Sequence, residues 1–184
     1  SNLQGLEDMN KELLTLLFPS SVDMGSIGSG KSNDSITVED VLVKLSYSKL
    51  TTEELNFLLA KFLDDNSARS SLYHKIYDDA FALFEGTELD ITKDVLQKVV
   101  DCAIIECILD ACPICKGTGF LVFDKSVEEC THCHKGKFSW NDFSRHNVMG
   151  IDKNTYVKVR KQYSEIIDIL NNLECTALEK IGDK

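Results

Sequence analysis

Four cysteines in the third quarter of the chain have the residue types and spacing of a metal site. They form two Cys-x-x-Cys pairs, Cys112–Cys115 and Cys130–Cys133, with fourteen residues between the pairs. Each pair can hold one ion from a tight turn, and four thiolates complete the tetrahedron that Zn²⁺ prefers. The sequence therefore predicts one structural zinc ion with Cys112, Cys115, Cys130 and Cys133 as its ligands.

Glycines follow the second cysteine of each pair. Gly117 and Gly119 follow the first pair and Gly136 follows the second. Glycine suits these positions because a chain that reverses around a metal often needs a positive φ, which costs glycine nothing. A strict repeat would also have glycine at Lys135 and Lys137, so we expect the second half to be a degenerate copy of the first.

Two short strands are expected between the cysteine pairs, over Phe120–Phe123 and Ser126–Glu129. They would form a hairpin whose base the metal holds. Two disulfides are the alternative use of the cysteines. Because the chain shows no secretory signal pattern, we expect a reducing compartment, where metal-bound thiolates are favoured over disulfides.

The length and composition predict one main domain with its own core and a small appendage, and the helical spacing of the apolar residues described below makes the fold mainly α, a helical bundle. With 184 residues and 43% hydrophobic residues, the chain can bury a core without depending on the metal for its whole fold. No apolar run approaches the length of a membrane span. We therefore expect a cytoplasmic protein with no membrane partner.

The charge is strongly uneven along the chain. The net charge is −10, and residues 1–115 carry 9 Lys/Arg against 20 Asp/Glu, whereas residues 116–161 carry 9 against 5. Three of the four histidines also fall in this basic window. Such asymmetry indicates a nucleic-acid-facing part attached to an acidic remainder. The alternative is that a small zinc module carries lysines only for solubility.

Residues 1–36 are predicted to be a flexible N-terminal segment. Met9–Phe18 is a short helix candidate ended by Pro19, and Gly25–Ser32 matches G-x-x-x-x-G-K-S, the phosphate-binding loop of many NTPases. That loop requires a buried strand before it, and the preceding residues contain no β-run. We therefore expect a glycine- and serine-rich linker and no bound nucleotide.

Residues 37–111 are predicted to form an acidic helical core. A capping box at Thr51–Glu54 opens a helix, and a second helix follows the break at Asp64–Ser67. A third, apolar on several sides, spans Ile91–Ala111 and runs directly into Cys112, which would attach the metal module stiffly. The apolar faces expected for the first two helices are Leu55, Leu58, Leu59 and Phe62, then Leu72, Ile76, Ala80 and Leu83.

Two further helices are predicted after the zinc-binding hairpin of residues 112–137, in a C-terminal part of residues 138–184. The first begins at a Ser139 cap and ends before Gly150, and the second is capped by Asp152. Tyr156, Val159, Tyr163, Ile166, Ile167, Leu170 and Leu173 share one stripe of the second helix, whereas Asn154, Lys158 and Lys161 lie on the far side. This pattern is typical of a helix-turn-helix, although two helices that simply pack on the core would show it too.

The order of these elements resembles the Q antitermination proteins of lambda-like bacteriophages. The likeness rests on a helical region, Cys112-x-x-Cys115-x-Gly-Thr-Gly, a hairpin, Glu129-Cys130-x-x-Cys133-x-x-Gly, and a long C-terminal helix. Chaperones of the DnaJ type share the first motif but repeat it four times in a strand-rich chain. The resemblance covers residues from about Asp34 to the end.

The resemblance implies a transcription regulator and not an enzyme. Such proteins bind DNA near a phage late promoter in the bacterial host, join RNA polymerase holoenzyme paused with its σ factor, and carry it through terminators. The acidic helices would be available to polymerase or to a second copy of the protein. The alternative is a zinc-stabilised protein–protein adaptor or chaperone-like module without nucleic acid. The candidate DNA-binding residues are Arg145, Lys153, Asn154, Lys158, Arg160 and Lys161.

Overall fold

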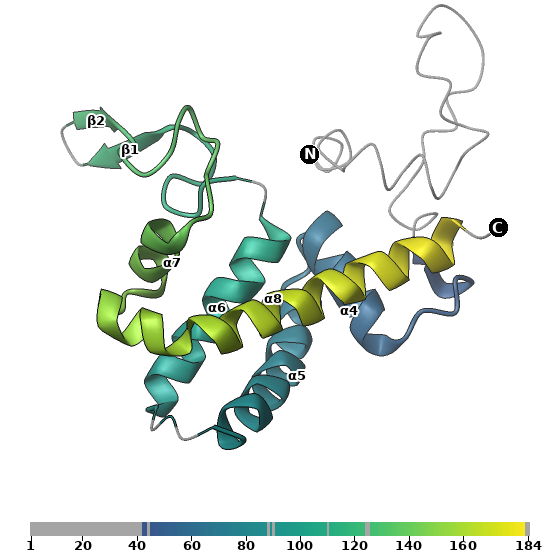
Figure 1. Cartoon of the computed structure of the whole chain (residues 1–184). Coiled ribbons are helices and arrows are strands. Elements are labelled where there is room, and N and C mark those ends of the chain that lie inside the picture. Colours follow the sequence, from purple (N-terminus) through teal and green to yellow (C-terminus); the bar gives the residue numbers. More distant parts are fainter. Residues whose placement is uncertain are drawn as a thin grey trace, which may run out of the picture. The chain divides into compact units, whose positions relative to one another are not determined.

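The computed structural model describes residues 42, 43, 45–87, 89, 91–109, 111–123 and 126–182. These residues are mainly helical, with one small two-stranded antiparallel sheet (Figure 1), which confirms the predicted fold class. None of the helices described is long and apolar enough to cross a membrane. The helix predicted for Met9–Phe18 and the loop-like Gly25–Ser32 lie outside the described residues.

The chain divides into two compact units. One unit contains the residues up to Arg69 together with those from Leu173 onward, and the other contains Ser70–Asn172. The helices α5 (Asn66–Glu85) and α8 (Lys153–Gly182) each contribute to both units. The second unit holds the four predicted ligand cysteines and all the candidate DNA-binding residues.

Helix α4 (Thr52–Phe62) lies in the first unit and begins with the predicted capping box. The Thr51 hydroxyl accepts from the Glu54 amide, and the Glu54 carboxylate accepts from the Thr51 amide at 2.7 Å. The buried face differs from the predicted one: Phe57 and Leu58 are fully buried, while Leu55, Leu59 and Phe62 are only half-buried. Because Glu54 itself turns inward, the face that packs is rotated toward Phe57.

Two ion pairs join α4 to the last turns of α8 within this unit. Lys180 binds the carboxylate of Glu54 at 2.7 Å, and Lys61 binds Glu174 at 2.6 Å. Glu54 is only 4% exposed. Burial raises the pKa of Glu54, but the bonds from Lys180 and the Thr51 amide outweigh burial and bring the pKa below its usual value.

Helices α5 and α6 (Lys93–Ile108) supply much of the core of the second unit. Helix α6 is buried on more than one side, as predicted, and the predicted Leu72, Ile76 and Ala80 form the buried stripe of α5. The stripe continues to Phe84 and not to the predicted Leu83, which is only half-buried. However, α6 ends at Ile108 and not at Ala111, because Ala111 is extended and forms a β-bridge with Lys137. Leu109 and Ala111 are both extended, so α6 does not run directly into Cys112 as predicted. The buried residues are Leu72, Ile76, Ala80 and Phe84, then Leu96, Val99, Val100, Cys102, Ala103, Ile104 and Ile108.

The sheet is the predicted hairpin. Strand β1 (Phe120–Phe123) pairs with β2 (Ser126–Glu129), with Phe120 opposite Glu129 and Phe123 opposite Ser126. Every residue of the two strands except Leu121 is exposed. The hairpin therefore projects from the cysteine cluster instead of joining a core of its own.

Helix α7 (Asp142–Met149) begins two residues later than predicted for its cap. Asn141 is the N-cap: its side chain accepts from the Ser144 amide, and the Ser144 hydroxyl accepts from the Asn141 amide. Ser139 instead provides a carbonyl that accepts from the Ser144 hydroxyl at 2.9 Å. The helix therefore starts after Asn141, because Asn141 and Ser144 cap each other's backbone amides, and not after Ser139.

A three-residue turn joins α7 to α8. Gly150 ends α7 in the left-handed region at φ 63°, and its amide donates to Asn147 O. Asp152 then caps α8 as predicted, because its carboxylate accepts from the amides of Asn154 and Thr155. The bonds from Thr155 hold the pKa of Asp152 below its usual value.

Candidate metal centre and basic helical face

The four predicted ligand sulfurs lie together at the base of the hairpin. All four Sγ atoms are within 4.8 Å of one another, and those of Cys115 and Cys133 are 3.6 Å apart. A tetrahedral ion with Zn–S bonds of about 2.3 Å would place its sulfurs about 3.8 Å apart. The sulfurs are free thiols, too far apart for a disulfide bond. The donor set therefore suits one metal ion.

Backbone amides point at these sulfurs. Gly119 N–H donates to Cys115 Sγ at 3.3 Å. The Ile114 amide donates to the Cys112 sulfur, and the Gly136 amide donates to the Cys133 sulfur. Such donors stabilise the negative charge that a thiolate ligand carries. Each cysteine turn is thus built to present a charged sulfur.

Two of the four thiols have strongly shifted pKa values. Burial raises the pKa of the Cys115 thiol, but the Gly119 amide and the neighbouring thiols, foremost Cys133, outweigh burial and lower this pKa to about 6. Burial and the adjacent Cys115 thiolate raise the pKa of Cys133 to about 12. Four negative sulfurs repel one another at this distance, and a bound cation removes the repulsion.

The two cysteine turns pack backbone against backbone through their glycines. Gly117, Gly119 and Gly136 all have φ near +80°. A Cβ atom on Gly136 would lie 2.0 Å from Gly117 O, which is impossible without moving the main chain. Lys135, which stands where a strict repeat would have glycine, also has a positive φ of 50°. The backbone there keeps a conformation typical of glycine although the residue is lysine.

Main-chain hydrogen bonds cross-link the two turns, but few side chains support them. Cys112 N–H donates to Gly136 O at 3.0 Å, and Cys130 N–H donates to Gly119 O at 2.8 Å. Among apolar side chains outside the cysteines, Leu121 and Phe138 pack against the cluster. Since so little apolar surface is buried here, a bound ion would be the main source of stability for this module.

Arg145 is held inside the second unit and does not point to solvent. Its guanidinium makes two bonds to the Glu106 carboxylate of α6, at 2.9 and 2.6 Å, and lies over the ring of Tyr163 from α8. The Tyr163 hydroxyl donates to the same carboxylate. The pairing with Glu106 raises the pKa of Arg145 further. The Arg145 guanidinium thus joins α7 to α6 and α8. The prediction that Arg145 contacts DNA is therefore wrong.

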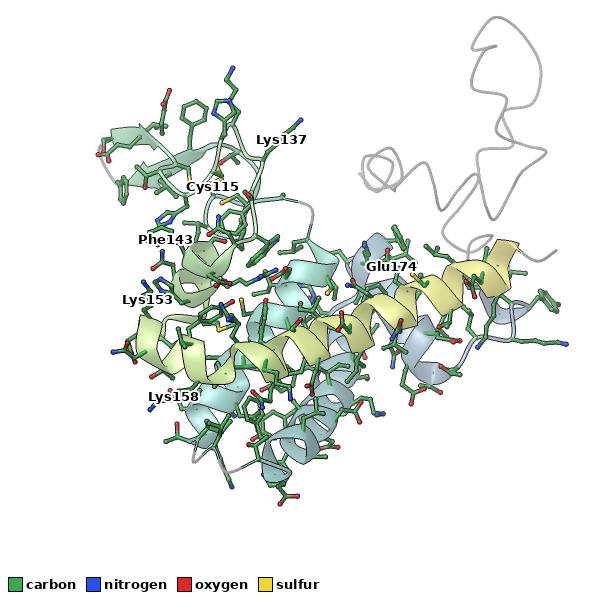
Figure 2. The ribbon with its side chains drawn as sticks, in the orientation of Figure 1. Cys115, Lys137, Phe143, Lys153, Lys158 and Glu174 are labelled. Atoms are coloured by element: carbon green, nitrogen blue, oxygen red, sulfur yellow. The ribbon has the colours of Figure 1, made fainter. Side chains whose placement is uncertain are left out.

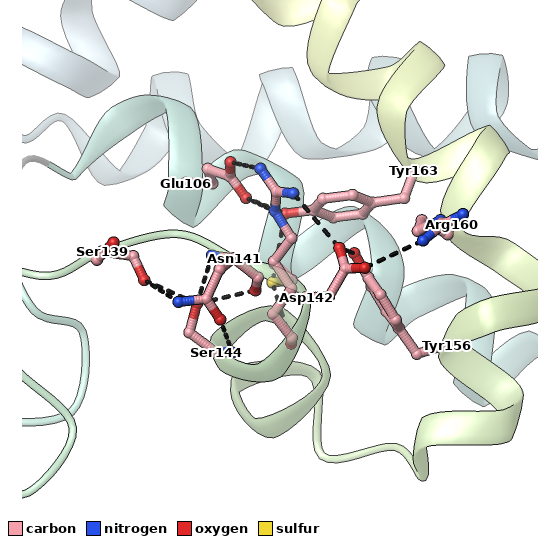
Figure 3. A network of polar contacts seen from close by, with 10 residues as sticks. Glu106, Ser139, Asn141, Asp142, Ser144, Tyr156, Arg160 and Tyr163 are labelled. Atoms are coloured by element: carbon pink, nitrogen blue, oxygen red, sulfur yellow. Dashed lines mark hydrogen bonds and ion pairs between the residues drawn. The ribbon is translucent and has the colours of Figure 1, made fainter.

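A second set of bonds joins the start of α7 to α8. The Asp142 carboxylate accepts from the Tyr156 hydroxyl at 2.9 Å and from Arg160 at 3.1 Å (Figure 3). These bonds hold the pKa of Asp142 below its usual value. Arg160 is more than half exposed, so its ion pair is weak and its guanidinium remains accessible.

The other predicted residues lie on the exposed side of the first turns of α8. The exposed residues are Lys153 and Lys158 (Figure 2), together with Asn154 and Lys161. The side chain of Lys161 is 82% accessible. Five residues of the predicted core stripe on the opposite side are buried: Tyr156, Val159, Tyr163, Ile166 and Leu170. The other two, Ile167 and Leu173, are only half-buried. The structure therefore presents four of the six predicted residues on one surface, with Arg160 at its margin.

Sequence reasoning missed Glu106, which anchors this helical pair. It lies in an otherwise apolar stretch of α6, and its carboxylate holds both Arg145 and Tyr163. A lone acidic residue on a buried helix is itself a signal, since a buried charge requires a partner.

Comparisons with protein-family models, curated proteins and solved structures gave no match.

Proposed function

We propose that this protein is a DNA-binding transcription regulator whose α7–α8 pair lies beside a zinc-clamped module. The observation that carries the proposal is the exposed face of Lys153, Asn154, Lys158 and Lys161, which follows a three-residue turn containing Gly150. Helix-turn-helix proteins use such a turn to place their second helix in the major groove of DNA. The protein would act by binding, without catalysing a reaction.

Zinc is the metal we assign to the four cysteines. Tetrahedral thiolate sites hold zinc or iron. A site with four protein ligands leaves no open position, so bound zinc would supply folding free energy and no catalysis. Elemental analysis of the protein purified without added metal should find about one zinc ion per chain. Iron in its place would contradict the assignment.

The specific role we propose is transcription antitermination from a phage or prophage late promoter. Its support is the order of elements around the cysteines, together with the acidic remainder of the chain. A net charge of −10 weakens binding to free DNA, so association should be cooperative with a paused RNA polymerase holoenzyme. A terminator-readthrough assay with that promoter tests the role, and no increase in readthrough would contradict it.

Charge reversal at Lys158 and Lys161 tests the DNA-binding face. About four phosphate contacts should make log K fall with log salt concentration with a slope near −3.6. In the Lys158→Glu/Lys161→Glu variant we expect the slope to shrink by about 2, DNA affinity to fall at all sequences, and readthrough to be lost.

A matched control is Lys49→Glu/Lys93→Glu. Both lysines are exposed, and the change in net charge is the same. This control should keep most of its DNA affinity, whereas equal losses in both variants would show that only net charge matters. Circular dichroism checks that both variants fold.

A second candidate function is a protein adaptor, favoured by the apolar surface of the hairpin. Phe120, Val122 and Val127 are between 50% and 80% exposed, and the adjacent Glu128 and Glu129 make this surface unsuited to nucleic acid. Exposed apolar side chains in such number often mark protein interfaces. Capture of a partner that is lost in Val122→Ser/Val127→Ser, without any salt-dependent DNA binding, would favour this function over the first.

A further inference from the structure

One face of α8 combines an amide, an exposed aliphatic side chain and two lysines. Asn154, Val157, Lys158 and Lys161 follow the i, i+3, i+4, i+7 spacing that places side chains on one side of a helix. All four are exposed, and Val157 is 57% exposed although it lies between lysines. Val157 belongs to no predicted site, and the core stripe on the opposite side does not use it.

This face has a defined end along the helix. The next residues at the same spacing after Lys161 are Glu165 and Asp168, and Glu165 Oε1 lies 3.9 Å from Lys161 Nζ. A phosphate backbone would be repelled from that point on. Contact with DNA is therefore restricted to the first three turns, the part of a recognition helix that contacts base edges.

The side-chain amide of Asn154 is available for a ligand. The Asn154 backbone N–H donates to the Asp152 carboxylate at 2.9 Å, which fixes the main chain at this position. No residue in the described part of the chain hydrogen-bonds the side-chain amide of Asn154. An asparagine amide matches the N6 donor and N7 acceptor of adenine, while an aliphatic side chain fits the methyl group of thymine.

The spacing of the two side chains matches neighbouring bases. Side chains at i and i+3 of a helix lie about 5–6 Å apart, compared with about 3.4 Å between stacked base pairs. Asn154 and Val157 can therefore reach the same base pair or the next one. Lys153, Lys158 and Lys161 flank them and can bind phosphates on either side.

We propose that Asn154 and Val157 read an A·T step in the major groove, with Asn154 on adenine and Val157 on a thymine methyl group. This inference rests on the proposed DNA-binding function and adds to it the base identity that the site recognises. The lysines supply affinity that is independent of sequence, while these two residues supply the selectivity.

Selection from randomised duplex DNA, followed by replacement of thymine with deoxyuridine, tests the inference on the full chain. In 50 mM salt the selected site should contain an A·T step. Deoxyuridine lacks the methyl group, so replacement at that step should weaken wild-type binding several-fold and leave Val157→Ala unaffected. Asn154→Ala should lose about 5- to 150-fold on the selected site and little on unrelated DNA.

The outcomes separate this inference from the function on which it rests. If a site is selected but neither variant changes the preference at any base pair, the DNA-binding function stands and the assignment of these two readers is overturned. If no duplex is retained even in 50 mM salt, the DNA-binding function fails and the inference fails with it. Ser164→Ala, on the same helix past Lys161, serves as a control that should change neither affinity nor preference.

Discussion

At the scale of single residues, Gly136 is the position with the least freedom. Its φ is +85°, and any Cβ atom would meet the Gly117 carbonyl from the other cysteine turn. The two turns approach this closely because the four sulfurs must converge on one point. The glycine is required by a contact between main chains and not merely by a turn.

Replacement of Gly136 and Gly150 by alanine separates these two requirements. Both residues have positive φ, but a Cβ on Gly150 would meet nothing within 4 Å. We expect Gly150→Ala to destabilise the protein by about 1–2 kcal/mol through backbone strain alone. Gly136→Ala should lose metal affinity as well, measured by competition with a chromogenic chelator. Equal metal affinity in the two variants would contradict the packing seen between the cysteine turns.

At the scale of elements, the hairpin and the helical pair are stabilised differently. Leu121 of the hairpin and the nearby Phe138 pack on the cysteines, and the other residues of β1 and β2 face solvent. Helix α7, by contrast, is joined to α6 and α8 by a network of charged hydrogen bonds around Glu106 and Asp142. We therefore expect the first element to need an ion bound by the cysteines, whereas the second is held by partly buried ion pairs.

Removal of the metal should therefore unfold the hairpin and spare the helices. After treatment with a strong chelator we expect the far-ultraviolet helical signal to remain close to that of the metal-bound protein. The amides of Gly119 and Cys130 should lose their protection from hydrogen exchange, while those of α6 keep theirs. Re-addition of zinc should restore the protection. Loss of protection throughout α6 would show that the metal stabilises the whole unit.

The Arg145–Glu106 pair should couple strongly in a double-mutant cycle. Each of Arg145→Met and Glu106→Gln leaves a partly buried charge without its partner, so we expect a loss of about 2–4 kcal/mol in unfolding free energy for either. The double variant should lose less than the sum. The exposed pair Lys75–Asp79 on α5 is a matched control, with a coupling of about 0.5 kcal/mol or less. Similar couplings for both pairs would contradict the role assigned to Arg145.

At the scale of the whole molecule, carboxylates with lowered pKa values occur in both compact units. Glu54 joins α4 to α8, Asp142 joins α7 to α8, and Asp152 caps α8. Each has a pKa below its usual value in the folded protein. A carboxylate whose pKa is lower in the folded than in the unfolded protein stabilises the fold. This stabilisation is fully present at pH values above the pKa of the unfolded state and is lost as the pH falls through the pKa of the folded state.

Acid should therefore destabilise this protein although its net charge is negative at neutral pH. Chemical denaturation should show unfolding free energy falling as the pH drops below about 5 toward about 2. Glu54→Gln should be less stable at pH 7 and show a shallower loss across this range. A wild-type stability that stays constant down to pH 3 would contradict the assignment of these three carboxylates.

The sequence by itself determined which four cysteines cluster, the two strands and most of the buried stripe of α8. These features repeat at short range, because a Cys-x-x-Cys turn, an alternating strand and a 3.6-residue stripe follow from local geometry. The tertiary structure alone decided that Arg145 faces Glu106, that α6 stops at Ile108 and that Gly136 touches Gly117. Each of these features depends on a partner at least nineteen residues away in the chain, which local sequence patterns do not reveal. The charge of Arg145 is the same whether it faces solvent or a buried carboxylate, so the residue type alone does not show which it faces.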